Sequence, residues 1–420
     1  MMTIEAFLDI KLSERIIDAR YKGLPEKAQG QSFKNFLDSK PNLFTSEFRF
    51  PIATLRKSAL DHNLSRMAAY CKEIGASLAP HLKTTMSPQI AKMQMDHGAW
   101  ALTLANFAQA KIFLDFGFKQ IIIANEIVDK GTIREIATIN FDGEHEIIFY
   151  VDSLAGLSII SEALEGLAQA KVLLLLEIGI QGGRGGIRDN QDAVILAKEI
   201  AKDSRLSLLG VSAFEGVVPG GGRSDDGLLK VAEFCKKIVE AAELVAPFVN
   251  QEKIILTAGG SNYFDIVSRE FAKYSKPFHM VLRSGGYITH DHGAYFNNYP
   301  FLGLPATQQL LPTIEVWAQV LTCPEPGVAI LNLGKRDAGI DTDNPFPLKR
   351  FHRELLPIEG RIDHLNDQHG YLYFSPNQQI AVGDLVSLGI SHPCTTFDKW
   401  RLFALVDDNY EVVDLIHTFF

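Results

Sequence analysis

The sequence predicts a closed (β/α)8 barrel of the TIM type, followed by a smaller and mostly β domain. One reason is the length of 420 residues, which exceeds what a single ordinary core holds and favours two domains. A second is an alternation of eight strand-like apolar runs with seven helical patterns. A third is the stretch after residue 300, where short strand candidates are separated by Gly, Pro, Asn and Asp without helical spacing.

The segment before the barrel is expected to be an arm, residues 1–45, in which an amphipathic helix precedes a polar stretch and which packs on something else. Residues 48–55 form a short strand candidate, and residues 56–74 show helical spacing. The apolar face of that helix is expected to carry Leu60, Leu64, Met67 and Cys71.

The barrel itself is placed within residues 46–300. Its strands are expected at 76–82, 100–105, 120–125, 146–152, 172–178, 206–214, 253–258 and 278–283. The helices between them are expected at 88–97, 107–116, 131–139, 154–167, 191–203, 228–244 and 264–274. Such alternation implies a parallel sheet, and eight units over roughly 210 residues favour a closed barrel over the alternative, an open doubly wound sheet.

The second domain is placed at residues 301–420 and is expected to be rich in β structure. Its strand candidates are 315–322, 328–333, 371–374, 385–390 and 402–406. No internal repeat and no low-complexity segment interrupts either part.

Charge and cysteine usage exclude several classes of protein. A formal net charge of −9 argues against nucleic acid or an anionic membrane as the main partner. The first 20 residues mix acids and bases with apolar residues, so neither a signal peptide nor a membrane span is expected. The four cysteines are widely scattered without a CxxC motif, which predicts a reduced, cytoplasmic protein.

The polar exceptions cluster where barrel strands end, which is where barrel enzymes keep their active sites. Lys83 follows the first strand, Asn125 and Glu126 end the third, Arg184 lies in a glycine-rich loop after the fifth, and Glu215 follows the sixth. Glycine-rich loops after strands seven and eight are typical of a phosphate site, because bare N–H groups can approach an anion closely. The residues of those loops are Gly259, Gly260, Ser261, Arg283, Gly285, Gly286 and Tyr287.

A phosphate site together with a lysine suggests pyridoxal phosphate, whose aldehyde needs an amine and whose phosphate needs an anchor. A sugar-phosphate aldolase with its own reactive lysine is the alternative from the residues alone. Several polar residues have plainer interpretations. Glu215 can cap a helix or pair with a lysine, Asp367 and His369 can be surface turn residues, and Arg188 and Arg223 are expected to be solvated.

The stretch PHLKT at residues 80–84, followed by a helix start at Ser87-Pro88, resembles the cofactor-lysine motif of fold-type III pyridoxal phosphate enzymes. More narrowly, the chain resembles the D-serine dehydratase and D-threonine aldolase branch of the alanine racemase-like barrels. Supporting stretches are residues 51–64, 124–126, the Arg184 loop, 364–370 and 391–398. Thr85 departs from the pattern, because many relatives have histidine there.

The resemblance implies a role for each candidate residue. Lys83 would hold the cofactor, the loops at 259–261 and 285–286 would bind its phosphate, and Arg184 or Arg283 would lie near its pyridine ring. His392 and Cys394 would bind a divalent metal, and a histidine–thiolate pair favours zinc. Without the resemblance, a His-x-Cys sequence is common by chance.

The expected function is that of a lyase that dehydrates and deaminates a β-hydroxy D-amino acid resembling D-serine, giving a 2-oxo acid and ammonia. Retro-aldol cleavage, racemisation and a non-catalytic pyridoxal phosphate carrier are the alternatives. A homodimer is expected, in which the β domain of one chain closes the barrel mouth of the other, because the reacting centre must be shielded from water.

Overall fold

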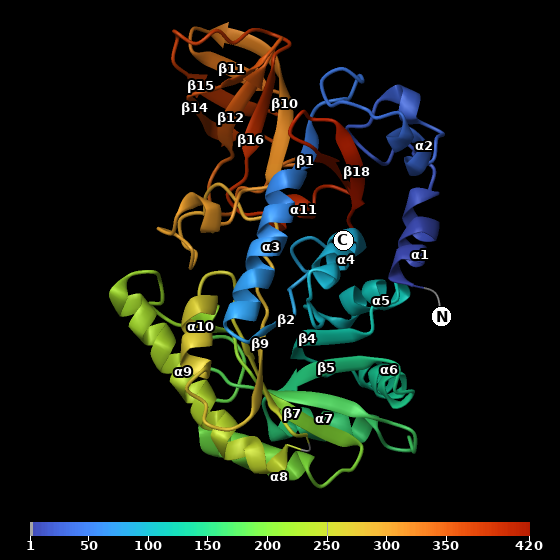
Figure 1. Cartoon of the computed structure of the whole chain (residues 1–420), viewed down its shortest axis with the longest axis vertical. Helices are drawn as coiled ribbons and strands as arrows, with labels where there is room; N and C mark the ends of the chain where they lie inside the picture. Colours follow the sequence, from blue (N-terminus) through green and yellow to red (C-terminus); the bar gives the residue numbers. More distant parts are fainter. Residues whose placement is uncertain (1–2, 250) are drawn as a thin grey trace.

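The computed structural model describes residues 3–249 and 251–420, and it confirms a parallel eight-stranded sheet of (β/α)8 type joined to a mostly antiparallel β domain (Figure 1). The order in the parallel sheet is β2-β9-β8-β7-β6-β5-β4-β3. Its strands are β2 (Ser77–Leu78), β3 (Leu102–Leu104), β4 (Gln120–Glu126), β5 (Glu146–Val151), β6 (Val172–Glu177), β7 (Leu206–Ser212), β8 (Ile254–Ala258) and β9 (Phe278–Leu282). All eight coincide with predicted strands.

The two edge strands of this sheet meet through backbone hydrogen bonds. The Thr103 N–H donates to the Pro80 carbonyl at 2.9 Å, and the Leu82 N–H donates to the Thr103 carbonyl at 2.8 Å. Strand β2 has only two residues, much shorter than predicted, since Pro80 has no N–H to continue the ladder. The chain therefore leaves regular β structure just before Lys83.

The predicted helices between the strands are all present. They are α4 (Pro88–Asp96), α5 (Phe107–Asp115), α6 (Lys130–Phe141), α7 (Leu154–Ala163), α8 (Asn190–Ile200), α9 (Asp225–Val245) and α10 (Phe264–Phe271). A side chain caps the first turn of each helix from α4 to α9, and these caps are Ser87, Asn106, Asp129, Ser153, Asp189 and Ser224. Each cap fixes where a loop from the preceding strand ends.

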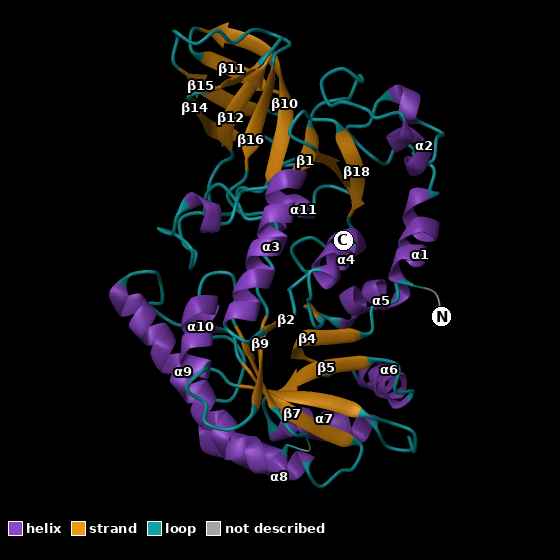
Figure 2. Cartoon of the chain, in the orientation of Figure 1, coloured by secondary structure: helices purple, strands orange, loops and turns teal. Residues whose placement is uncertain are grey.

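The β domain is built mostly from strands, whereas the barrel alternates strands with helices (Figure 2). The main sheet has the order β13-β12-β16-β10-β1-β17-β18, and β11, β14 and β15 extend it from β10. The strands are β1 (Ile52–Arg56), β10 (Ile314–Glu325), β11 (Val328–Leu331), β12 (Phe346–Phe351), β13 (Leu355–Pro357), β14 (Gly360–Leu365), β15 (Gly370–Phe374), β16 (Leu385–Gly389), β17 (Leu402–Val406) and β18 (Val412–His417).

One strand differs from its expected place. The sequence analysis puts residues 48–55 at the start of the barrel segment, but β1 pairs antiparallel with β10 and parallel with β17 in the β domain. A strand's own pattern does not reveal its partners. The helix that follows, α3 (Lys57–Glu73), buries the predicted apolar face and links the two parts.

The arm also differs from expectation. Instead of one amphipathic helix it has a short α1 (Ile4–Leu8), a π-helical turn at Asp9–Ser13 and α2 (Phe33–Asp38). Phe33 and Phe36 are buried in a cluster with residues of the β domain, among them Trp317 and Tyr410. The arm therefore packs on this chain's own β domain. No helix in the described ranges is long and apolar enough to cross a bilayer.

Candidate active site

A cavity of about 170 Å³ lies at the carboxyl ends of the barrel strands. The structure brings together most of the predicted site residues there, namely Lys83, Arg184, Gly260, Ser261, Arg283, Gly285 and Gly286. Asn125 also lines the cavity, as its place at a strand end predicts, and the lining residues that were not predicted are His81, Thr84, Ala105, Ala124, Tyr150, Glu177, Phe214 and Tyr295. Glu177 ends β6, so its strand-end position is a signal that could have found it.

Lys83 lies in the turn after β2 and is exposed to solvent. Its backbone N–H donates to Nδ1 of His81 at 3.4 Å. Burial and the nearby positive charges of Lys83 and Arg283 hold the pKa of His81 well below its usual range. The imidazole is therefore neutral and can accept this hydrogen bond.

The glycine loop after β8 is held by a buried carboxylate. Glu215 accepts the Gly259 N–H at 3.0 Å and the Gly260 N–H at 2.5 Å. The predicted roles of Glu215, a helix cap or a lysine partner, are wrong, because its oxygens bind this loop. Gly259 does not line the cavity, so it differs from the phosphate-binding expectation.

The loop after β9 supplies a cradle that only glycine fits. A Cβ on Gly285 would lie 2.1 Å from the His81 carbonyl oxygen, and one on Gly286 would lie 2.9 Å from Ser261 Oγ. The Gly286 N–H donates to that same Ser261 hydroxyl at 3.1 Å. A lysine amine opposite a hydroxyl and two bare backbone positions fits pyridoxal phosphate in both its aldehyde and its phosphate.

The two candidate arginines are held differently. Arg283 is buried, and its guanidinium donates to Thr257 Oγ1 and to the Ala213 carbonyl, both at 2.6 Å. Arg184 is exposed, and its guanidinium lies 5.5 Å from the Phe214 ring centre. Arg283 is thus a fixed part of the barrel interior, whereas Arg184 lies on a loop at its rim.

Tyr287 does not join the site with its side chain. It is 2% exposed within the hydrophobic core, and the Gln94 amide donates to its hydroxyl at 3.1 Å. The sequence analysis includes it because it follows the glycine pair, but its ring points into the core beside α4. The cavity receives Tyr295 from the same loop instead.

The two arginines expected to be solvated both have partners. Arg188 donates to the carbonyls of Arg184, Gly185 and Gly186 at 2.7, 2.6 and 2.7 Å, so it shapes the Arg184 loop. Arg223 forms an ion pair with Asp265 at 3.0 Å. Arg188 is nevertheless exposed, as predicted, whereas the Arg223 side chain is only 23% exposed and differs from the expected solvated state because it pairs with Asp265.

Two carboxyl groups meet at the cavity wall. Glu177 is 5% exposed, and Glu126 at the end of β4 lies against it. Burial, and then hydrogen bonding and repulsion from Glu177, raise the pKa of Glu126 to about 8. A Cβ on Gly185 would lie 2.6 Å from Glu177 Oε2, so the glycine loop closes over this pair. The pair therefore retains a proton at neutral pH.

The predicted metal residues come from the β domain and do not line the cavity, but each contacts a residue that does, Cys394 with Thr84 and His392 with Tyr295. Cys394 begins the short helix α11 (Cys394–Phe397), and its Sγ lies 3.1 Å from Thr84 Oγ1, next to Lys83. His392 Nδ1 lies 2.5 Å from Asp341 Oδ2. The thiol of Cys394 and the Asp341 carboxylate raise the pKa of His392 to about 9.

This donor set fits zinc in kind, because a carboxylate on one ring nitrogen leaves the other for a metal shared with a thiolate. Across residues 3–249 and 251–420, however, no group of three or more His, Cys, Asp or Glu side chains is arranged to hold a metal ion. Asp367 and His369 are exposed in the turn between β14 and β15, as their plainer interpretation predicts.

Comparisons with known proteins agree with this architecture. A family model described as "Putative serine dehydratase domain" matches residues 313–406. The chain is 25% identical to a D-threonine aldolase from Arthrobacter sp over 85% of its own length and 89% of that protein. The structure of D-threonine aldolase from Filomicrobium marinum superposes with a TM-score of 0.75 at 23% identity, covering 89% of this chain and 96% of that one.

A further similar structure is that of a D-threo-3-hydroxyaspartate dehydratase with a cysteine-to-alanine substitution, in the metal-free form. It superposes with a TM-score of 0.72 at 19% identity, over 90% of this chain and 99% of that chain. The similarities thus extend over both the barrel and the β domain.

Proposed function

Because the chain belongs to the fold-type III pyridoxal phosphate enzymes, we propose that it is a lyase that dehydrates and deaminates a β-hydroxy D-amino acid resembling D-serine. The products are a 2-oxo acid and ammonia. The observation that carries the proposal is the 3.1 Å approach of Cys394 Sγ to Thr84 Oγ1. It supports a role for the His392–Cys394 pair, because Thr84 lines the cavity and adjoins Lys83.

Residues of the barrel would bind the cofactor, and one of them would also transfer a proton. Ser261, Gly285 and Gly286 would hold the phosphate of pyridoxal phosphate, and Lys83 would hold its aldehyde. Bound there, the cofactor supplies an electron sink for the charge left at the substrate Cα. The Lys83 amine would take the α-proton of the bound substrate, and such base action contributes roughly 10²–10⁴-fold in rate.

Glu126 and Glu177 would carry one negative charge between them instead of two, because they share a proton. With one proton shared, Glu126 and Glu177 add a single negative charge to a wall that also carries Arg184. This keeps the wall from repelling the substrate carboxylate as strongly as two charges would.

The β domain would select the bond that breaks. His392 and Cys394 would hold a divalent cation, zinc by the softness of the thiolate, and that ion would stabilise charge developing on a departing hydroxyl. The Asp341 carboxylate orients the His392 ring for this purpose. Hydroxide is a poor leaving group, so the dehydration depends on this end of the site.

Retro-aldol cleavage is the second candidate, favoured by the similarity to two D-threonine aldolases. It would need a base on the β-hydroxyl instead of help for its departure. Incubating the cofactor- and zinc-loaded protein with D-serine, D-threonine and their L-forms separates the two. Ammonia and a 2-oxo acid from the D-forms are expected; glycine and an aldehyde from D-threonine as the main products would overturn dehydration.

We further propose a cytoplasmic homodimer in which the β domain of one chain helps to close the barrel mouth of the other. All four cysteines are free, which supports a reducing compartment. Lys83 is exposed at the mouth of its own cavity, which supports a covering partner. Sedimentation at micromolar concentration tests the assembly, and a fully active monomer would contradict it.

A further inference from the structure

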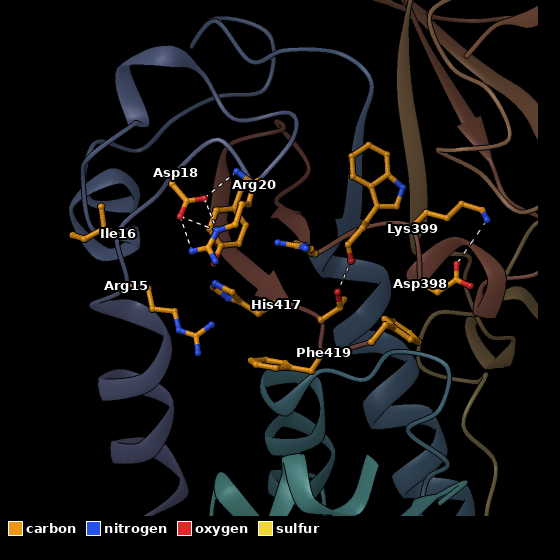
Figure 3. A pocket seen from close by; sticks show the side chains of 13 residues that line it. Arg15, Ile16, Asp18, Arg20, Asp398, Lys399, His417 and Phe419 are labelled. Atoms are coloured by element: carbon orange, nitrogen blue, oxygen red, sulfur yellow. Dashed lines mark hydrogen bonds and ion pairs between the residues drawn. The ribbon is translucent and has the colours of Figure 1, made fainter. Parts of the chain in front are cut away.

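A second and larger cavity, called here the arm cavity, has a volume of about 830 Å³ and shares no lining residue with the catalytic cavity. Its walls come from residues 15–21 of the arm, residues 398–401 after α11 and residues 417–420 (Figure 3). This volume falls within the roughly 300–1,000 Å³ of small-molecule sites. The reaction proposed above uses none of these residues.

The arm cavity carries more positive than negative side chains. Its basic residues are Arg15, Arg20, Lys399 and Arg401, and its acidic side chains are Asp18 and Asp398. Arg20 is bound to Asp18 at 2.6 Å, and Lys399 lies 3.8 Å from Asp398. Within the described ranges, no ion pair joins Arg15 or Arg401 to a carboxylate, although the charge of Arg401 contributes to the lowered pKa of Asp18. Two guanidinium groups therefore remain for an anion.

A buried histidine also lacks its partners. His417 is 3% exposed, and neither ring nitrogen has a hydrogen-bond partner in the described structure. Its ring is packed edge-on against Phe33 at 4.6 Å and Tyr21 at 5.9 Å. Burial and then the charge of Arg15 lower the pKa of His417 to about 4, although the nearby Leu415 carbonyl acts in the opposite direction without forming a hydrogen bond.

A neutral imidazole offers one N–H donor and one acceptor, and buried polar groups without partners are rare. In Figure 3, His417 lies between Arg15 and the Asp18–Arg20 pair, along the wall of the cavity. The Phe419 ring lies close to Arg15, whose guanidinium carbon is 5.7 Å from the ring centre. Cationic, neutral polar and aromatic groups therefore face one space.

We propose that the arm cavity binds a small organic oxyanion, a phosphate or carboxylate attached to a planar or apolar group. The guanidinium groups of Arg15 and Arg401 would take the oxyanion, since their planar forks match both anions. His417 donates a hydrogen bond to the ligand, and the Phe419 ring packs against its apolar part.

Hydrogen bonds connect the arm cavity directly to the chain that follows Lys83. The Phe419 N–H donates to the Met86 carbonyl at 3.0 Å, and the His417 N–H donates to Gln89 Oε1 at 2.8 Å. Met86 lies three residues after Lys83, and the opposite wall continues from the helix that begins at Cys394.

The test is calorimetric titration of the full-length, cofactor-loaded protein with phenyl phosphate, inorganic phosphate and benzoate. In the loaded protein the cofactor already occupies the phosphate cradle of the catalytic cavity. We expect one site per chain that prefers a ring-bearing anion over inorganic phosphate, and the stronger of phenyl phosphate and benzoate identifies the oxyanion. The double substitution R15Q/R401Q is expected to weaken binding about tenfold or more, and Lys236→Gln, an exposed lysine on α9, to leave it unchanged.

His417→Phe separates ligand binding from folding. It keeps an aromatic ring of similar size but removes both unpartnered nitrogens, so anion affinity should fall while the melting temperature without ligand holds or rises. Absence of binding by all three probes would overturn the proposal. An affinity that is unchanged in R15Q/R401Q would also overturn it. A third contradicting result is an R15Q/R401Q protein whose oligomeric state changes while wild type binds no probe, because a second copy of the chain would then cover this surface.

Discussion

The barrel lines the candidate cavity and the β domain contacts one of its lining residues, Thr84, but the two parts hold their groups in different ways. In the barrel, Glu215 fixes the glycine loop through two N–H groups, and Arg283 is fixed by two hydrogen bonds of 2.6 Å. The β domain reaches the site through α11, a helix of four residues, and through the contact of Cys394 with Thr84. Under the proposed function, this difference predicts that cofactor retention depends on the barrel and the choice of reaction on the β domain.

The largest expected effect tests the barrel side. Lys83→Ala should abolish turnover, a loss of at least roughly 10²–10⁴-fold, because the variant removes the amine proposed to hold the cofactor and to take the α-proton. It should also lose the visible absorbance of lysine-bound cofactor. Lys92→Ala, a lysine of α4 paired with Asp96 at 2.6 Å, is the matched control and should keep both.

Peptide mapping after borohydride reduction adds a chemical check. The wild-type protein must carry the reduced cofactor on Lys83. A label on any other lysine would contradict the assignment of Lys83 as the lysine that binds the cofactor.

The β domain side predicts a separate loss. His392→Ala, Cys394→Ala or chelation should lower ammonia release by about 10²-fold or more, since assistance to the leaving hydroxyl is removed. The cofactor absorbance should persist, because the phosphate cradle and Lys83 are untouched. Cys323→Ala, at a half-buried cysteine of β10, is the control. If these variants lost the cofactor together with activity, the β domain would also be needed for cofactor binding, and the proposed division of roles between barrel and β domain would be wrong.

A smaller effect is expected from the carboxylate behind the glycine loop. Glu215→Gln leaves one acceptor oxygen and one amide donor where the carboxylate now accepts from both Gly259 and Gly260. One N–H then loses its partner, and cofactor affinity should fall about tenfold. Titration of the unloaded protein with pyridoxal phosphate measures this, with Glu233→Gln on the exposed side of α9 as control. Unchanged affinity would show that the loop does not need its anchor.

The same contrast decides what the sequence could reveal. In the barrel, apolar strands alternate with capped helices, so all eight strands and seven helices are predicted, and strand ends locate Lys83 and Arg283. The β domain has no such period: five strands are predicted, whereas β12, β13, β14 and β18 are not. Phe346–Phe351, for example, reads FPLKRF and its six residues are all half-buried, so no inward–outward alternation marks it.

Sequence patterns do not predict contacts between side chains that lie far apart in the chain. Nothing in the sequence pairs Glu126 with Glu177, because their proximity depends on barrel curvature and on the glycine loop at Gly185. Glu215 and Arg188 carry no local mark of the backbone groups they bind. The Cys394–Thr84 contact joins residues 310 positions apart, and only the family resemblance indicated that this cysteine belongs to the site.

The smallest expected effect concerns the acid pair and stability. An ordinary glutamate loses its proton near pH 4.5, but the pKa of Glu126 in the folded protein is raised to about 8. Between these values the folded state binds more protons than the unfolded state, so this group makes stability fall as pH rises, and the fall ends above about pH 8. Glu126→Gln keeps a neutral side chain at every pH and removes this contribution.

Melting temperatures of wild type and Glu126→Gln should therefore agree near pH 5 and separate as pH rises, with the variant the more stable by a few degrees at pH 8–9. The expected difference is limited because Glu126 is only half-buried and Asp152 also acts on it. Glu240→Gln, at an exposed position of α9, should show no such divergence. If the melting temperatures of wild type and Glu126→Gln changed in parallel with pH, Glu126 and Glu177 would not share a proton. The barrel wall would then carry two negative charges at neutral pH.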